Sequence, residues 1–359
     1  MNYWGVGPDG NVEQKIENWK NKKYRGELLY GLTHFKEAGL DVILPRFKEH
    51  RSYGRESWIP NLLDILREKR KYDIVYAAYY SGLEALIYLR GFRLYRKKIV
   101  IWQHRPIEKP TGNFIRRFLY RVFLNGIDKF IFFGENARNE SLESGILPKR
   151  KTAVLDWGPD IEFFDHLLEE ASGKEFSDVR FISTGRDHRD FETLIMAFQG
   201  LSARLDLYVI TKELFEKYEN SGENITVHLI ESNPSLESSL LSAYTVGLAL
   251  AKSSVVIICS EAVTRLKQSF GLTSLIEAIA LGKPSIITRN RYIPQYFEDN
   301  GVGLFINPGN VEELKAAIVK ICSDQQLRHQ LGSNSRKFAT ERCNLKLFTK
   351  QLALLLESI

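Results

Sequence analysis

Short runs of β-branched and other apolar residues recur along this chain, and they limit its possible folds more than any other feature. The first half contains DVIL (41–44), DIVYA (73–77), KIVIW (98–102), DKFIFF (128–133) and TAVL (152–155). The second half contains VRFIST (179–184), LDLYVI (205–210), ITVHL (225–229), SVVII (254–258) and PSIIT (284–288). Several runs lack polar alternation, which is typical of parallel strands covered on both faces. Longer helix-compatible stretches separate them, so the pattern predicts an α/β fold.

The alternation of strand and helix runs twice, which favours two domains. A chain of 359 residues is also long for a single hydrophobic core. We expect one doubly wound α/β domain over residues 1–165 and a second over 166–340. The join is expected near residues 162–178, where charged and small residues replace the strand pattern. A C-terminal helix over about 340–359 is expected to pack back on the first domain.

Composition indicates a soluble globular protein, with 44% hydrophobic and 26% charged residues. No run of about 18 uncharged apolar residues appears, and the N-terminus lacks the apolar core of a signal peptide, so we expect a cytoplasmic location. Cys259, Cys322 and Cys343 are widely spaced and odd in number, which indicates reduced packing residues. The net charge of +6 suits an anionic partner such as a nucleoside diphosphate, an anionic lipid or a nucleic acid.

Polar residues follow three of the predicted strands, and ligands of open parallel sheets bind beyond such strand ends. Gly185, Arg186, His188 and Arg189 follow the run at 179–184. His104 and Arg105 follow the run at 98–102. A polar loop follows the run at 254–258 and leads into the helix-compatible FGLTSLIEA (270–278).

The segment at 270–278 has the composition of a phosphate cradle, since a helix N-terminus attracts anions and glycine allows a close approach. The cradle residues would be Phe270, Gly271, Leu272, Thr273 and Ser274. A carboxylate one turn further should repel a diphosphate, so Glu277 is better suited to accept hydrogen bonds from ribose hydroxyls. Arg186 and Arg189 would neutralise the two phosphates and so stabilise the diphosphate as a leaving group.

Each of these interpretations has a structural alternative. Ser274 and Glu277 have the spacing of a capping box, in which both would only stabilise the helix start. Arg186 and Arg189 could be solvated residues at a strand end, and His104 could be a structural histidine. Their occurrence together at three strand ends favours a binding site.

Four segments resemble family-4 retaining glycosyltransferases. They are GRDHRDFETLIMAF (185–198), FGLTSLIEAIALGKPSIIT (270–288), VLDWGPDIEFF (154–164) and NPGNVEELKAAIVKICSD (307–324). In the third segment Gly158, Asp160 and Phe164 match the family's interdomain pattern. The resemblance covers about residues 150–335 and is only topological before them.

The resemblance implies the GT-B architecture, in which two Rossmann-like domains face each other across a cleft. It implies a UDP- or GDP-sugar donor on the C-terminal domain, a glycan or glycolipid acceptor on the N-terminal domain, and retention at the anomeric carbon. The diphosphate-gripping residues of the family correspond to Arg186 and Arg189, beside Gly185. Its histidine after an N-domain strand corresponds to His104, and its ribose-binding glutamate to Glu277. No metal cofactor is implied, and the chain has no Asp-x-Asp pair.

The chain departs from the family pattern in two places. Many members have two glutamates separated by seven residues, whereas counting back from Glu277 gives Ser269, with Gln268 beside it. Gln268 is therefore included in the candidate donor site, and the donor sugar is left open. The family's hydrophobic first strand is represented at most by Tyr3 and Trp4.

Residues 113–124 form a helical stripe of apolar residues with Arg116, Arg117 and Arg121 beside it. A helix on a sheet needs an apolar face, so we first interpret this stripe as core. The alternative is a basic amphipathic helix lying on an anionic membrane surface. No recognised RNA or DNA motif is present, so we do not expect a nucleic-acid partner.

Together these features predict a glycosyltransferase of bacterial surface polysaccharide or glycolipid synthesis, cytoplasmic or peripheral on the inner face of the membrane. Two alternatives stay open. A sugar-nucleotide epimerase could share the fold, and a catalytically silent partner subunit would fit the missing first glutamate.

Overall fold

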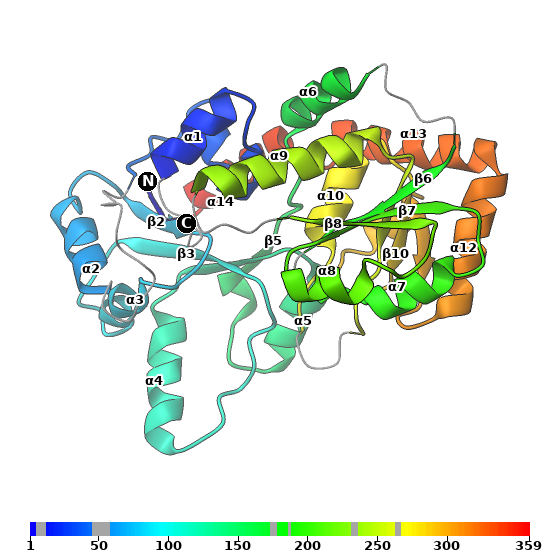
Figure 1. The fold of residues 1–359 in the computed structure, drawn as a ribbon. Coiled ribbons are helices and arrows are strands. Elements are labelled where there is room, and N and C mark those ends of the chain that lie inside the picture. The colour runs from blue at the N-terminus through cyan, green and yellow to red at the C-terminus, as the bar shows by residue number, and fades with distance from the viewer. Residues whose placement is uncertain (5–11, 45–57, 173–177, 186–187, 231–235, 263–266) are drawn as a thin grey trace. The chain divides into compact units, whose positions relative to one another are not determined.

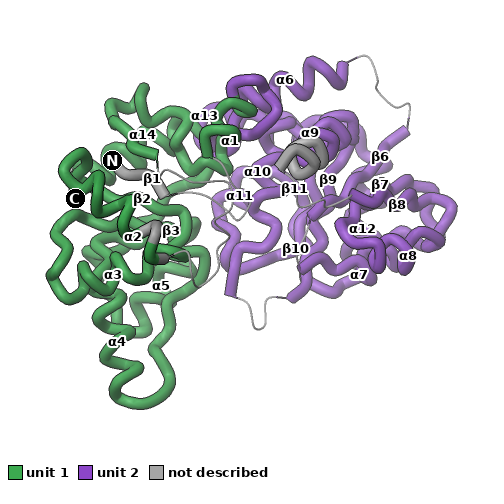
Figure 2. The backbone as a smooth tube through the Cα atoms, turned by 60° about the vertical axis from the view of Figure 1, so that its left-hand side comes forward, with its two compact units in different colours: residues 1–19, 26–157, 345–359 green, residues 20–25, 158–344 purple. Residues whose placement is uncertain are grey.

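The computed structural model describes residues 1–4, 12–44, 58–172, 178–185, 188–230, 236–262 and 267–359 (Figure 1). The chain forms two compact units (Figure 2). Unit 1 contains residues 1–19, 26–157 and 345–359, and unit 2 contains residues 20–25 and 158–344. The predicted boundary after residue 165 lies too late, because it divides helix α6 (Ile161–Ala171). The charged residues of this segment belong to an amphipathic helix that buries Phe164 and Leu167.

Unit 1 has a five-stranded parallel sheet in the order β1-β2-β3-β4-β5. The strands are β1 (Asn2–Trp4), β2 (Ile74–Ala77), β3 (Lys98–Gln103), β4 (Lys129–Phe132) and β5 (Thr152–Val154). The predicted strand at 41–44 is wrong in extent, since only Ile43 forms an isolated bridge, and its amide donates to the carbonyl of Met1. The short first strand does form, and it pairs with β2 in parallel.

Helices cover the sheet of unit 1. They are α1 (Val12–Lys20), α2 (Trp58–Arg67), α3 (Glu84–Gly91), α4 (Phe114–Asn125), α5 (Glu135–Glu143) and α14 (Leu345–Glu357), with the 3-10 turns η1 (Gly26–Leu29), η2 (Leu32–His34) and η3 (Lys149–Lys151). Helix α14 comes from the end of the chain and joins this unit through Phe348, whose ring lies 5.7 Å from that of Trp102.

Helix α4 is attached to unit 1 at one end only. A side chain at Gly91 of α3 would collide with the backbone of Val122, and one at Gly126 would collide with that of Ile87, so the two glycines allow close packing. The other end of α4 extends away from the strands of its unit (Figure 1). Four apolar residues there are exposed by 38–76%: Phe114, Ile115, Phe118 and Leu119. The core interpretation of residues 113–124 is therefore wrong for the first half of the helix.

Unit 2 has a six-stranded parallel sheet in the order β11-β10-β9-β6-β7-β8. The strands are β6 (Arg180–Ser183), β7 (Arg204–Val209), β8 (Ile225–Leu229), β9 (Val255–Ile258), β10 (Ser285–Thr288) and β11 (Gly303–Ile306). Strand β11 is short and begins at a glycine, and it was not predicted from the sequence. Strand order reverses between β6 and β9, and in sheets of this kind that point is where ligands bind.

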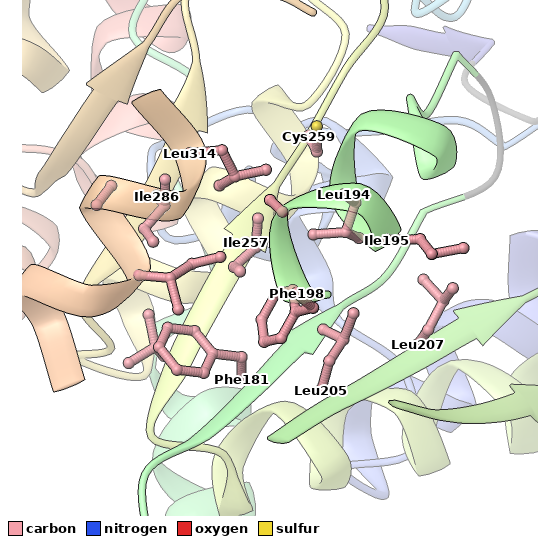
Figure 3. Packing of buried hydrophobic residues seen from close by; sticks show 14 of the residues in the cluster. Phe181, Leu194, Ile195, Phe198, Leu205, Leu207, Ile257, Cys259, Ile286 and Leu314 are labelled. Carbon is pink, nitrogen blue, oxygen red and sulfur yellow. The ribbon is translucent and has the colours of Figure 1, made fainter. Parts of the chain in front are cut away.

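The helices of unit 2 are α6, α7 (Phe191–Phe198), α8 (Lys212–Tyr218), α9 (Leu236–Lys252), α10 (Leu272–Ala280), α11 (Tyr296–Asp299), α12 (Val311–Ser323) and α13 (Gln325–Glu341). A buried cluster joins the strands to α7 and α12 through residues such as Phe181, Phe198, Ile257 and Leu314 (Figure 3). Cys259 belongs to this cluster, and all three cysteines are free thiols. In the described part of the chain, no helix combines the length and apolar character needed to span a bilayer.

Candidate functional site

The candidate donor site lies in unit 2, where the chain leaves β6 and β9. These strands pair in parallel, so their carboxyl ends lie at the same edge of the sheet. The turn after β6 is hydrogen-bonded to the segment after β9: the amide of Asp190 donates to the carbonyl of Cys259 at 3.1 Å, and the amide of Glu261 donates to that of His188 at 3.1 Å. The structure thus brings together two of the strand ends that the sequence analysis selected.

Arg189 connects three parts of this site. Its Nε donates to the carbonyl of Thr184 at 3.0 Å, its Nη1 to Oγ of Ser260 at 3.2 Å, and its Nη2 to Oγ of Ser274 at 3.0 Å. Gly185 has a φ of +145°, and a side chain there would collide with the guanidinium of Arg189. A glycine is therefore required where the chain turns past the arginine. The predicted partner Arg186 lies outside the described residues.

Helix α10 begins without a side-chain cap. Its N-cap is Gly271, in the left-handed conformation at φ +89°. An added Cβ at this position would lie 2.6 Å from Cγ2 of Ile258. The capping-box interpretation is therefore wrong: Gly271 takes the cap position, and the hydroxyl of Ser274 accepts a hydrogen bond from Arg189 instead.

The first turn of α10 presents residues with different exposure. Leu272 is buried beneath the turn, whereas Thr273 is partly exposed. The amide of Leu272 donates to the carbonyl of Ser269 at 3.2 Å. The first amides of an α-helix have no partners within the helix, so those of Thr273 and Ser274 can donate hydrogen bonds to an anion. Ser274 is buried and lies on the same helix as the predicted ribose-binding residue.

Glu277 is 4% exposed and forms an ion pair with the guanidinium of Arg25. A buried carboxylate is costly unless an opposite charge or hydrogen bonds compensate it, so Arg25 stabilises Glu277 in its charged form. Arg25 belongs to residues 20–25, which group with unit 2. Arg25 was not predicted from the sequence. Its only signal is the basic run KNKKYR, which lies far along the chain from Glu277.

The loop before α10 is held by Asn290, which follows β10. Its Nδ2 donates to the carbonyl of Gln268 at 2.9 Å and to that of Phe270 at 3.4 Å. The ring of Phe270 lies 4.1 Å from that of His188, and Nδ1 of His188 is 3.2 Å from Oε2 of Glu261. Asn290 and Glu261 were not predicted from the sequence, although both follow strands at this edge.

His104 lies in unit 1, directly after β3. Its Nε2 is 3.2 Å from the hydroxyl of Tyr30, and its ring stacks on Tyr79 with the centroids 4.6 Å apart. Burial, followed by the positive charge of Arg105, lowers the pKa of His104 to about 4. The imidazole is therefore uncharged at neutral pH and can exchange a hydrogen bond with a hydroxyl.

Tyr30 and Tyr79 were not selected from the sequence. Tyr79 comes shortly after β2, the strand beside β3, so its position after a strand end was a signal for it in the sequence. Tyr30 follows the 3-10 turn η1, and its ring stacks on Trp157 at 5.8 Å. This aromatic packing fixes the hydroxyl beside His104.

The donor-site residues have the chemistry of an anion site. Within the described ranges, no group of three or more His, Cys, Asp or Glu side chains is placed to hold a metal ion. The site instead combines guanidinium groups, serine hydroxyls and a helix N-terminus, which together suit phosphate oxygens.

Part of unit 2 is similar in sequence to known proteins. Residues 241–338 match the sequence model of the family described as "Glycosyl transferases group 1", and they include β9, α10 and β10. A stretch of 80 residues is 32% identical to the uncharacterized glycosyltransferase MJ1178 of Methanocaldococcus jannaschii, covering 21% of this chain and 22% of that protein. Residues 241–338 are thus similar in sequence to group 1 glycosyltransferases.

Solved structures match the whole chain. HepE of Anabaena, solved in complex with UDP, superposes with a TM-score of 0.66 at 18% identity, over 100% of this chain and 99% of that one. WaaG, a glycosyltransferase involved in lipopolysaccharide biosynthesis, superposes with a TM-score of 0.60 at 14% identity, over 99% of both chains. The predicted fold class is confirmed: two α/β domains with parallel sheets, as in GT-B glycosyltransferases.

Proposed function

We propose that this protein is a retaining glycosyltransferase that moves a sugar from a UDP- or GDP-sugar to a glycan or glycolipid acceptor. The arrangement of Arg189 and Ser274 at the reversal of strand order carries this proposal. Both side chains lie where a diphosphate is expected to bind, and Ser274 lies within the glycosyltransferase group 1 match.

The donor diphosphate would lie against the first turn of α10. Gly271 permits close approach of the backbone, while Thr273, Ser274 and Arg189 supply donors for the phosphate oxygens. Arg189 would also stabilise the charge that develops on the leaving nucleoside diphosphate. Glu277, further along the same helix, would accept hydrogen bonds from the ribose hydroxyls.

His104 would serve the other reactants. Because the imidazole is uncharged at neutral pH, it can exchange a hydrogen bond with a sugar hydroxyl without contributing a charge. Tyr30 and Tyr79 hold the ring in place. The acceptor is accordingly proposed to bind to unit 1.

The reaction is proposed to need no metal cofactor. Positive charge from Arg189, together with the amides of the first turn of α10, would balance the diphosphate, and this replaces the role that a divalent cation plays in other transferases.

The direct test is a panel of UDP-, GDP- and ADP-sugars, with donor hydrolysis and thermal shift as readouts. We expect one nucleotide class to raise the melting temperature and its sugar conjugate to be hydrolysed slowly. If no nucleoside diphosphate stabilises the protein, the proposal is wrong. Release of an isomerised sugar nucleotide without any acceptor would favour an epimerase, and binding without turnover would favour a silent partner subunit.

Helix α4 supports a peripheral location on the inner face of a membrane. Exposed Phe114 and Phe118 lie beside exposed Arg116, Arg117 and Arg121, which is the combination that binds anionic lipid. An acceptor for a bacterial surface polysaccharide or glycolipid would be met at such a surface.

Vesicle sedimentation tests this location. The protein should sediment with phosphatidylglycerol vesicles and not with phosphatidylcholine vesicles, and Phe114→Ser with Phe118→Ser should abolish sedimentation. Leu94→Ser is the matched control, since Leu94 is 75% exposed in the same unit but lies outside α4. The proposal is contradicted if the Phe114/Phe118 variant and Leu94→Ser lose sedimentation equally, or if the wild type binds neither kind of vesicle.

A further inference from the structure

Residues 20–25 form a basic segment that groups with unit 2, although the residues on both sides of it group with unit 1. The segment contains Lys20, Lys22, Lys23 and Arg25. Lys22 bonds through Nζ to Oε2 of Glu162 at 3.5 Å, and Arg25 pairs with Glu277. Cationic side chains are thus held against the unit that carries the candidate donor site.

Two arginines contact consecutive turns of α10. Arg189 donates to Ser274, and Arg25 pairs with Glu277 three residues later. Residues three apart lie on the same face of a helix, about 5 Å from one another. The two guanidinium groups are therefore anchored to neighbouring positions on one face of α10, beginning in its first turn.

Glu277 would otherwise oppose the ligand proposed for this site. A carboxylate within one helical turn of a diphosphate repels it, and the repulsion is stronger where protein excludes water. Pairing with Arg25 cancels the charge of Glu277. A guanidinium has five N–H donors in a planar fork, so it can address a carboxylate and a phosphate together.

We propose that Arg25 is a further donor-binding residue, which contacts the diphosphate of the bound nucleotide while Glu277 accepts hydrogen bonds from its ribose. This inference rests on the proposed function, because it assumes a nucleotide at α10. It assigns a ligand contact to residues 20–25, a segment that lies far in sequence from the rest of the donor site.

The competing explanation is that Arg25 only compensates the buried charge of Glu277. Under that explanation, the loss of Arg25 disturbs Glu277 and weakens every ligand that has a ribose, with or without phosphates. Under our proposal, the loss of Arg25 weakens only the binding of ligands that carry phosphates. The nucleotide and its nucleoside therefore distinguish the two.

The experiment measures the binding of UDP by calorimetry and of uridine by competition, with GDP and ADP and their nucleosides in parallel. Arg25→Ala should weaken UDP about tenfold or more, the effect of losing one charge-assisted hydrogen bond, and uridine less than about threefold. Arg25→Lys should lie between Arg25→Ala and the wild type, because it keeps the charge and loses the fork. Lys23→Ala is the matched control, since Lys23 is exposed in the same segment and its removal changes the net charge equally.

Arg25→Ala leaves a buried carboxylate without this cation and could unfold. The same comparison is therefore made between Glu277→Gln and the double variant Glu277→Gln with Arg25→Ala, in which that carboxylate is absent. The double variant should bind UDP about tenfold more weakly than Glu277→Gln and bind uridine equally well. If the arginine variants bind UDP like their parents, or lose UDP and uridine equally, the inference is overturned and the proposed function stands. If the wild type binds no nucleoside diphosphate, both are overturned.

Discussion

Arg189 and Ser274 are 85 residues apart in sequence, yet Nη2 of the arginine lies 3.0 Å from Oγ of the serine. This hydrogen bond joins the turn after β6 to the first turn of α10. Because Arg189 also binds Thr184 and Ser260, its guanidinium is held in one orientation before any ligand arrives. A preorganised cation of this kind is what stabilises a departing diphosphate most effectively.

Arg189→Ala should therefore lower both UDP affinity and the rate of donor hydrolysis, each by about tenfold or more, as expected for a charged hydrogen-bonding group. Calorimetry and product release measure the two effects. Arg204→Ala, which removes an arginine exposed by 61% in the same unit, is the control and should change neither. If Arg189→Ala binds UDP as tightly as the wild type, Arg189 is not a donor-binding residue.

Glu277→Gln should weaken UDP by about 1.5 to 3 kcal/mol, the range for hydrogen bonds to a charged group. The reason is the loss of the carboxylate acceptor for the ribose hydroxyls. The same substitution should cost less with 2′-deoxy-UDP, which lacks one of those hydroxyls. A penalty that is identical for the two ligands would place Glu277 away from the ribose.

His104→Ala should lower donor hydrolysis while UDP affinity stays within about threefold of the wild type, which is roughly 0.7 kcal/mol. The expected split follows from the assignment of His104 to the sugar or the acceptor. The control is His329→Ala, at an exposed position in unit 2. Abolished UDP binding in His104→Ala, with normal binding in Arg189→Ala, would contradict the division of roles between the units.

The stability of unit 1 should fall as the pH is lowered from about 6.5 towards 4. The pKa of His104 is about 4 in the folded chain and lies below its ordinary value of 6.5, so between these values the unfolded chain binds more protons. The stabilising contribution is present above pH 6.5 and is lost on acidification. Its size is on the order of 2 kcal/mol.

Tryptophan fluorescence during urea unfolding can follow this effect, because all five tryptophans belong to unit 1. His104→Gln should reduce the loss of stability between pH 6.5 and pH 4.5. An unchanged pH profile in that variant would assign the acid sensitivity to other groups.

Donor hydrolysis should persist in EDTA, because arginines and helix amides balance the phosphate charge in the proposed mechanism. The measurement compares rates with and without the chelator after dialysis. Loss of activity that manganese or magnesium restores would show that a metal ion is required.

The sequence predicted the proximity of those candidate-site residues that parallel-sheet geometry brings together. Arg189 and Ser274 follow from the rule that adjacent strands end at one edge. Arg25 could not be predicted in this way, because the position of residues 20–25 depends on how a short segment packs against α6 and α10. The prediction of a strand at 41–44 was wrong for a similar reason, since the pairing of this segment is limited to the bridge at Ile43.

The stripe at 113–124 shows a different limit of sequence reasoning. An apolar helical face looks the same whether it covers a sheet or meets another surface. Here Gly91 and Gly126 decide which half is buried, and neither lies within the stripe.

Because α4 is attached at one end only, substitutions have different consequences at its two ends. At its base, any residue larger than glycine at position 91 or 126 must displace a neighbouring backbone, so these positions are fixed by the fold. At its tip, polar replacements of Phe114 or Ile115 remove no buried contact and should leave folding unchanged. The sequence of the tip can therefore vary without cost to folding, while the base preserves the direction in which the helix points.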